Sequence, residues 1–259
     1  MRIGVIMIHP DGYKKAFMEQ ATYDFITSAG IEVVPILPTI GAAEAAAYFE
    51  YIHGLYLHPG FPGDYTGLLN NLRISKLFLT MAVAANKQGD YFPIWGSCMG
   101  FQLIIRHVGV LEKMNDYDSL ELHHQHLTLT GAPSRILSYA TPDQYTYFTK
   151  AYQPWYNHQL GISVDRFMAS SSLSSTFNVI STSHDRKGHE YIAFIEGKEL
   201  PFYGVQFHPE YHQPVWWLMG FLHRELEKSK HRGFSPLPGA LVHETLQTEI
   251  GPLDCMTYV

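Results

Sequence analysis

The 259-residue sequence predicts an α/β protein: a three-layer sandwich with a mostly parallel central sheet flanked by helices, plus a smaller antiparallel β segment. Two observations predict this class. Up to about residue 108, short apolar runs alternate with stretches of helical periodicity, as in parallel sheets covered on both faces. Between 112 and 200 the pattern changes to alternating or apolar runs separated by turn residues, which is typical of antiparallel strands and hairpins.

The parallel part can be followed element by element. Strands are predicted at the short apolar runs, and helices where apolar residues recur every three or four positions or where alanine dominates. The predicted strands are 3–8, 31–37, 52–57 and 92–95. The predicted helices are 14–30, 42–51, 66–88 and 99–108.

In the second half, strands are predicted at 126–131, 177–183, 190–197 and 202–207. A helix is predicted over 214–229, with an apolar stripe that should face the core: Val215, Leu218, Met219, Leu222 and Leu226. No linker or internal repeat interrupts the chain, so one domain over 1–230 is favoured. The tail, 231–259, lacks clear periodicity and is expected to be extended on the domain or partly disordered.

Charge and hydropathy exclude some classes of function. The net charge is −6, and the one basic run, 224–232, has the pattern of a solvated helix end, so nucleic acid is not an expected partner. No apolar run reaches the roughly 18 residues that cross a bilayer, so no membrane partner is expected. The sequence leaves a homodimer open.

Cysteine usage bears on the compartment. Two cysteines, Cys98 and Cys255, cannot form a disulfide framework, which favours a reducing environment. The first residues enter a strand pattern without the features of a signal peptide. A cytoplasmic location is therefore expected, with a lysosomal or secreted one as the alternative if a signal peptide has been removed.

The stretch "IWGSCMGFQL" (94–103) places Cys98 between Gly96 and Gly100, at a strand-to-helix turn. Glycines permit a strained turn that lifts a nucleophile above the sheet, and the following helix N-terminus favours the thiolate. Taken alone, the pattern fits a reactive cysteine and a buried packing cysteine about equally well.

A second motif, "GVQFHPE" (204–210), follows a predicted strand. His208 and Glu210 are two residues apart, so they share one face of an extended chain. A histidine beside a cysteine can accept its proton, and a carboxylate on the other ring nitrogen fixes the tautomer. The two motifs together predict a Cys98–His208–Glu210 triad.

The third motif is "LHPGFPGD" (57–64), at the carboxyl end of a predicted strand, where open α/β sheets place their sites. The backbone N–H of Phe61 is expected to oppose that of Met99 across a developing oxyanion. No metal is expected: the histidines of "HHQH" (123–126) lack cysteines or carboxylates at zinc-type spacing. No cofactor is expected either.

These three motifs, at 57–64, 94–103 and 204–210 of an alternating α/β chain, resemble the class I glutamine amidotransferase-like superfamily. Within it, "DYFPIWGSCMGFQLI" and "FYGVQFHPE" look most like gamma-glutamyl hydrolases (peptidase family C26), cysteine peptidases that trim poly-gamma-glutamyl tails from folates. The resemblance covers roughly residues 2 to 225. It implies that Cys98 is the nucleophile, His208 the base and then acid, and Glu210 its orienting partner, with a thioester intermediate.

The resemblance also implies a substrate pocket for a small gamma-glutamyl molecule. Its residues would be Gly60, Gln102, His158 in "YNHQ", and Tyr13. Two positions depart from the folate-type pattern. Phe61 stands where such hydrolases often have glycine, and Gln102 fits the amidotransferase pattern where they have glutamate.

The predicted reaction is therefore hydrolysis of gamma-glutamyl amides, such as those of folyl-polyglutamates. A glutaminase that delivers ammonia to a partner synthase is one alternative, and a catalytically silent binding protein on the same fold is another. A polyglutamate chain is acidic, so cations would have to gather at the cleft. The sequence offers Lys14, Lys15, Arg73 and Lys76.

Overall fold

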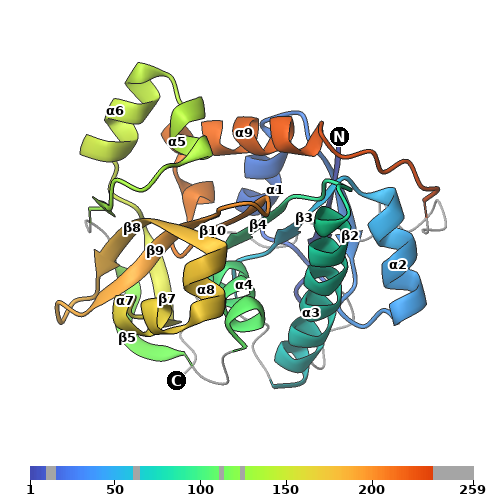
Figure 1. The fold of residues 1–259 in the computed structure, drawn as a ribbon, viewed down its shortest axis with the longest axis horizontal. Helices are drawn as coiled ribbons and strands as arrows, with labels where there is room; N and C mark the ends of the chain where they lie inside the picture. Colours follow the sequence, from blue (N-terminus) through green and yellow to red (C-terminus); the bar gives the residue numbers. More distant parts are fainter. Residues whose placement is uncertain (10–15, 61–64, 111–113, 123–125, 236–259) are drawn as a thin grey trace.

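A computed structural model of the chain describes residues 1–9, 16–60, 65–110, 114–122 and 126–235. Their centre is an eight-stranded sheet in the order β2-β1-β3-β4-β10-β9-β8-β6 (Figure 1). Its strands are β1 Arg2–Ile6, β2 Glu32–Ile36, β3 Gly54–Leu57, β4 Ile94–Ser97, β6 Thr128–Leu129, β8 Phe177–His184, β9 Glu190–Gly197 and β10 Phe202–Val205.

The sheet has a parallel and an antiparallel part. β2, β1, β3, β4 and β10 run parallel, and β9, β8 and β6 continue the sheet with antiparallel pairings. The register pairs Ser97 of β4 with Val205 of β10. The chain segments that follow these two strands therefore leave the sheet side by side, at its carboxyl edge.

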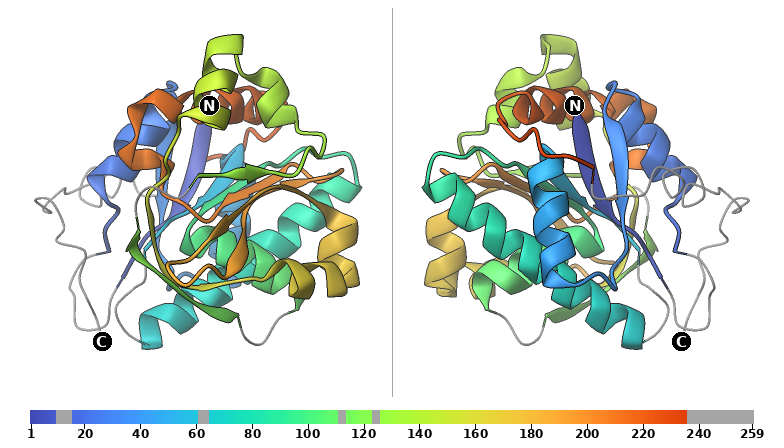
Figure 2. Two further views of the ribbon diagram at one scale, coloured as in Figure 1. Left: turned by 90° about the vertical axis from the view of Figure 1, so that its left-hand side faces the viewer. Right: turned by 90° about the vertical axis from the view of Figure 1, so that its right-hand side faces the viewer.

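Helices cover both faces, as the views in Figures 1 and 2 show. Each face has its own apolar cluster, one packed by α1, α5, α6 and α9 and the other by α2, α3, α4, α7 and α8. The helices are α1 Gln20–Thr27, α2 Ala42–Tyr51, α3 Tyr65–Lys87, α4 Met99–Gly109, α5 Arg135–Tyr139, α6 Pro142–Lys150, α7 Val164–Ala169, α8 Ser171–Thr176 and α9 Trp217–Leu226, with short 3₁₀ turns η1 Pro209–Tyr211 and η2 Gln213–Val215.

A two-stranded antiparallel sheet lies beside the main one. It consists of β5, Asn115–Leu122, and β7, Tyr156–Gly161. Its register shifts twice, between Asp116 and Ser119 and again before Leu122. β7 passes the carboxyl edge of β4, where the carbonyl of Asn157 lies 3.8 Å from the sulfur of Cys98.

The predicted fold class is confirmed: helices flank a sheet whose first five strands are parallel, and a smaller antiparallel sheet is present. The stripe predicted on the last helix is completely buried. The predicted helix over 14–30 begins later, at Gln20, because Phe17 forms a bridge with Ile8 instead. The second half was predicted as strands, and the helices α5 to α8 were missed.

The segment after α9 is held against the domain at His231 and at Gly233, whose N–H donates to the carbonyl of Glu50 at 2.8 Å. The buried ring of His231 bonds through Nδ1 to the carbonyls of Phe49 and Ile52, and Nε2 lies 2.9 Å from a carboxylate oxygen of Asp90. The tail predicted from 231 is described only to residue 235. Within the described ranges, none of the helices is long and apolar enough to cross a bilayer.

Candidate active site

Cys98 lies at the turn between β4 and α4, as the motif predicts. Its backbone has φ 48° and ψ −105°, a region that non-glycine residues rarely adopt. Such strain costs on the order of 1–3 kcal/mol and persists only where surrounding contacts fix it. Here the N–H of Cys98 donates to the carbonyl of Val205 at 2.8 Å, and its carbonyl accepts from Gln102 N–H. The sulfur is buried, with the residue 5% exposed.

Both flanking glycines are required by close backbone contacts. A Cβ on Gly96 would stand 2.5 Å from the carbonyl carbon of Gly100. A Cβ on Gly100 would stand 2.1 Å from the carbonyl oxygen of Leu57 on β3. The elbow therefore packs against β3 and against its own first helical turn, so a side chain at either position would move Cys98.

His208 and Glu210 follow β10 and lie beside the elbow. Nδ1 of His208 lies 2.7 Å from Oε1 of Glu210, and both side chains are buried. The backbone N–H of His208 donates to the carbonyl of Trp155 at 3.0 Å. Nε2 of His208 is buried and has no hydrogen bond of normal geometry within the described residues. The predicted trio is thus brought together, with Nε2 left on the side of the thiol.

The electrostatics couple these three groups. Burial alone would lower the pKa of His208, but the charges of Cys98 and Glu210, together with side-chain hydrogen bonding, outweigh it and raise this pKa well above 6.5. This shift favours the charged form of the imidazole. A charged imidazole beside a sulfur and a carboxylate can serve as a proton donor to a leaving group.

The loop after β3 is described as far as Gly60. Gly60 has φ +95°, which an L side chain rarely adopts. His58 fixes this turn: its Nδ1 bonds to the carbonyl of Pro59, and its Nε2 accepts from the N–H of Glu19 at 3.3 Å. Burial lowers the pKa of His58 to about 3, so its ring is neutral. Phe61, the predicted oxyanion donor, and Tyr13, a predicted pocket residue, lie outside the described residues.

Two other predicted pocket residues meet at the carbonyl of Leu160. It accepts from Nε2 of Gln102 at 2.7 Å and lies 3.0 Å from Nδ1 of His158. Burial, and then the charge of His208, lower the pKa of His158 to about 3. A neutral ring that donates from Nδ1 leaves Nε2 as an acceptor, and this atom is buried without a hydrogen-bond partner in the described part of the chain.

The sequence did not point to three further residues near His208. The rings of Trp155 and Tyr211 are 4.8 and 5.8 Å from the ring of His208, centroid to centroid. The hydroxyl of Tyr211 donates to Oε2 of Glu19 at 2.9 Å. Burial, and then the negative charge of Glu210, raise the pKa of Glu19. Glu19 precedes α1, and no local motif marks it.

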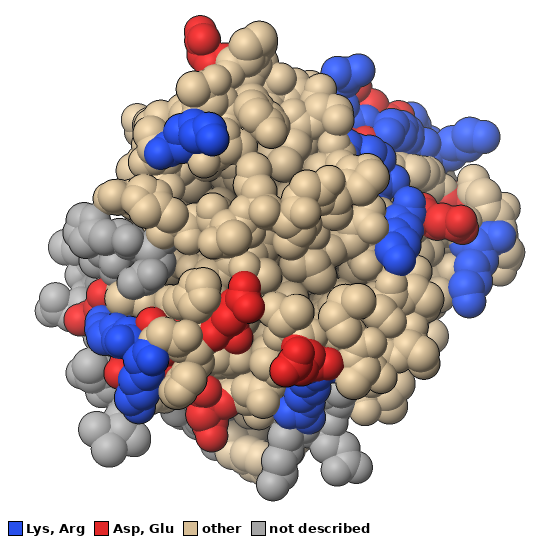
Figure 3. All heavy atoms as spheres, turned by 60° about the vertical axis from the view of Figure 1, so that its left-hand side comes forward, with Lys and Arg blue, Asp and Glu red and all other residues tan. Residues whose placement is uncertain are grey.

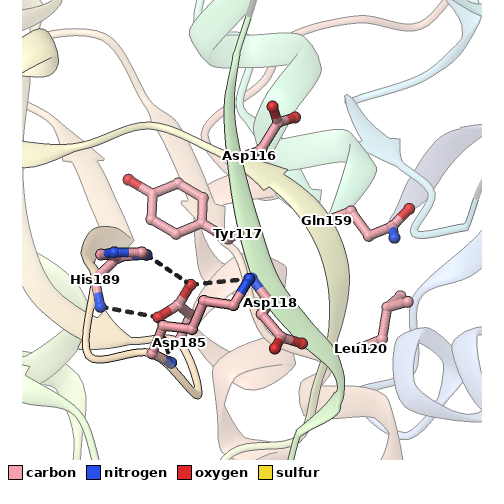
Figure 4. Close-up of a pocket in the computed structure, with 8 residues that line it drawn as sticks. Asp116, Tyr117, Asp118, Leu120, Gln159, Asp185 and His189 are labelled. Carbon is pink, nitrogen blue, oxygen red and sulfur yellow. Dashed lines mark hydrogen bonds and ion pairs between the residues drawn. The ribbon is translucent and has the colours of Figure 1, made fainter.

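A separate hollow of about 260 Å³ lies at β5 and the β8–β9 turn (Figure 4). Asp185 there accepts from the backbone N–H groups of Asp118, Lys187 and His189 at 2.8 to 3.0 Å. Burial would raise the pKa of Asp185, but these bonds and the His189 ring together hold it below its usual value. Asp185 therefore has a structural role in closing the turn. Among the described residues, no group of three or more His, Cys, Asp or Glu side chains is arranged to hold a metal ion.

Solved structures of other proteins share the fold of this chain. A GMP synthase component from Thermoplasma acidophilum has a TM-score of 0.56 at 16% identity, covering 88% of this chain and 93% of that one. PurLQS from Thermotoga maritima has a TM-score of 0.54 at 14% identity, covering 87% and 97%. At such identities the likeness shows the fold alone.

Sequence relatives carry a more specific name. Gamma-glutamyl hydrolase B of Dictyostelium discoideum is 28% identical over 215 residues, which cover 79% of this chain and 59% of that protein. The gamma-glutamyl hydrolases of Rattus norvegicus and Homo sapiens are 30% and 27% identical, covering 84% and 76% of this chain. The chain thus spans 59 to 64% of the length of these three relatives.

The family model described as glutamine amidotransferase class-I matches residues 22–215. That range includes β4, the elbow, α4, β10 and the segment from His208 to Glu210. The match confirms the superfamily that the three motifs predicted. The chain belongs to the class-I glutamine amidotransferase family.

Proposed function

We propose that the chain is a cysteine hydrolase that cleaves gamma-glutamyl amide bonds through a Cys98–His208–Glu210 triad. The thiolate of Cys98 attacks the side-chain carbonyl of the glutamyl group, and the N–H groups of Met99 and Phe61 hold the oxyanion. His208 protonates the departing amine, which leaves a gamma-glutamyl thioester on Cys98. Water, deprotonated by His208, then hydrolyses the thioester and releases the glutamyl group with a free gamma-carboxylate.

One observation carries this proposal: a strained cysteine at a glycine-bounded elbow lies beside a buried His208–Glu210 pair with an O–N separation of 2.7 Å. A cysteine that only filled space would not need a positive φ, nor a charged histidine next to it. Burying two ionisable side chains, His208 and Glu210, costs free energy of folding. A catalytic role, in which they act on the sulfur and on the leaving nitrogen, explains why the protein has them there.

The other side of the elbow suits the glutamyl group. His158 presents a neutral, buried Nε2 acceptor, and an N–H group on the substrate is the donor that would satisfy it. Gln102 is held beside it through the carbonyl of Leu160. We assign the α-nitrogen of the glutamyl group to this side, as an ammonium in a simple gamma-glutamyl amide or an amide N–H in a folyl-polyglutamate. This leaves the scissile nitrogen on the side of His208.

Gamma-glutamyl amides differ in the amine that leaves. In (poly)gamma-glutamyl conjugates such as folyl-polyglutamates, the class expected from the resemblance, that amine carries a carboxylate beside the scissile nitrogen. In glutamine it is ammonia, as the glutaminase alternative requires. Incubation with free glutamine, a gamma-glutamyl dipeptide and a folyl-polyglutamate, with products read by mass, separates these cases.

The proposal expects glutamate release from at least one gamma-glutamyl amide at a rate well above that from free glutamine. Ammonia release from glutamine alone would support the glutaminase alternative. A protein that turns over none of them, and whose Cys98 labels with a thiol reagent no faster than a free thiol, would support the binding alternative.

Replacing Glu210 by Gln tests the role of the carboxylate. Glu210 helps to raise the pKa of His208, so in Glu210→Gln this pKa should fall, because burial then has less opposition. The imidazolium donates to the leaving amine, so activity is lost as pH rises through the pKa of His208. The alkaline limb of the pH–rate profile should therefore move to lower pH, and the rate at neutral pH should fall about 100-fold or more.

Glu32→Gln removes an equal charge from an exposed position at the start of β2 and serves as the control. It should leave both the limb and the rate unchanged. An alkaline limb that stays in place in Glu210→Gln would remove Glu210 from the proposed triad.

A further inference from the structure

From the groups beside His208 we infer that Glu19, held by Tyr211, determines which leaving amines the protein accepts. Gamma-glutamyl amides with a cationic or uncharged leaving amine should be cleaved faster than those whose leaving amine carries a carboxylate. The inference rests on the proposed function, because it concerns the amine that this reaction would release. It names Glu19 as a specificity-determining residue.

The first step is to locate the leaving side. The proton donor to the amine is His208, so the scissile nitrogen must come near its Nε2. Beside the ring of His208 lie the rings of Trp155 and Tyr211, 4.8 and 5.8 Å from it, and these two rings contact each other edge to face at 4.8 Å. An amine substituent that leaves past His208 therefore meets these two rings. Aromatic faces attract cations and apolar groups, and they offer an anion no such attraction.

The second step is the position of Glu19. Its Oε2 accepts from the hydroxyl of Tyr211 at 2.9 Å. Its backbone N–H donates to His58, the residue that fixes the loop before Gly60. Oε1 lies 3.6 Å from the point where a Cβ on Gly60 would stand. The carboxylate is thus fixed from two elements, between the loop after β3 and the aromatic rings.

The third step is charge. Glu19 is close enough to the catalytic pair that the charges of Glu210 and His208 both act on it. Burial and Glu210 together disfavour its ionised form, and a cation on the substrate would relieve both effects. A carboxylate on the substrate would add its negative charge to those of Glu19 and Glu210, which the single positive charge of His208 does not balance. Complementary charge favours a cationic or neutral amine, and like charge disfavours an anionic one.

The lysines and the arginine that the sequence analysis named as possible cations do not add positive charge near Glu19 within the described residues. Arg73 donates to the carbonyls of Pro38 and Ile40, and Lys76 lies near His107 on α4. Lys14 and Lys15 are outside the described residues. On the face drawn in Figure 3, acidic side chains lie next to basic ones in the lower part of the view, so that part presents no purely basic surface.

A matched set of amides tests the inference. The gamma-carboxyl of glutamate is coupled to butylamine, to 1,4-diaminobutane and to 4-aminobutanoate, which gives amine sides of similar length that are neutral, cationic and anionic. The observable is the ratio of kcat/KM between the cationic and the anionic amide. Wild type should show a ratio of about ten or more. Glu19→Gln, which keeps an acceptor for Tyr211, should bring it to within about twofold of unity, and Glu19→Lys should reverse it.

Asp24→Asn removes one charge from an exposed position on α1 and is the matched control, with the ratio expected at its wild-type value. Tyr211→Phe, at a residue that is 48% exposed, is a second variant that releases Glu19 without removing it, and it should lower the ratio. An equal ratio in wild type, or one that Glu19→Gln leaves unchanged, overturns the inference while the proposed function stands. Failure to cleave any of the three amides overturns both.

Discussion

Cys98→Ala is expected to lower kcat for gamma-glutamyl amide hydrolysis by at least about 10⁴-fold while the protein stays folded. The reason is that no other group at the elbow can form the thioester. The hydrogen bond from the sulfur to the carbonyl of Asn157 is long, at 3.8 Å, and a methyl group keeps most of the packing, so losing the sulfur costs little stability. The free energy of unfolding, measured by thermal denaturation, should therefore change by about 1 kcal/mol or less.

Two further variants separate chemistry from strain. Cys98→Gly removes the same sulfur, but glycine accepts a φ of 48° readily, so this variant should be inactive and about 1 kcal/mol more stable than Cys98→Ala. Cys255→Ser replaces the only other cysteine of the sequence and should retain full activity. Substantial turnover by Cys98→Ala would contradict the proposed chemistry.

Gly100→Ala is expected to damage both stability and activity. The new Cβ would stand 2.1 Å from the carbonyl oxygen of Leu57 and 2.7 Å from its carbonyl carbon, and backbone atoms of a central strand cannot move aside easily. The start of α4 must shift away from β3 instead. We expect a loss of about 3 kcal/mol in the free energy of unfolding.

The same shift moves Cys98 and the N–H of Met99 relative to His208, so the activity that remains should be at least about 100-fold lower. Gly41→Ala is the control, because a Cβ there meets no atom within 4 Å and φ is −80°. It should cost about 1 kcal/mol or less. Urea unfolding and steady-state rates on the two variants measure both effects, and a fully active Gly100→Ala would show that the elbow tolerates displacement.

The elbow and the His208–Glu210 pair could be predicted from the sequence because each is a local pattern. The glycines on both sides of Cys98 indicate a crowded backbone within a stretch of five residues. Glu210 is only two positions from His208. Their meeting follows from topology: β4 and β10 are neighbours in parallel, so the segments after them emerge together. Their catalytic roles stay predictions.

Glu19 could not be predicted in the same way. Its partner Tyr211 is 192 positions away in the sequence, and the contact exists only because α1 and η1 pack together. Nothing in the residues around Glu19 distinguishes it from an ordinary exposed glutamate ahead of a helix. A charge-selecting position of this kind requires the tertiary structure.

The helices missed in the second half have two causes. α5, α7 and α8 contain five or six residues each, too short for a hydrophobic period to show. α6 did carry a usable signal, since Thr141 just before the helix and Gln144 in its first turn form a capping box, with Pro142 as the first helical residue. Reading that motif would have placed a helix there.

The central claim, that Cys98 carries the glutamyl group during turnover, is tested most directly by trapping the intermediate. The protein is mixed with a gamma-glutamyl amide, quenched in acid within the first turnover, digested and analysed by mass spectrometry. The account predicts one glutamyl group on the peptide that contains Cys98, removed by hydroxylamine as a thioester should be. An unmodified Cys98 peptide at every time point, from enzyme that releases glutamate in the same samples, would contradict it.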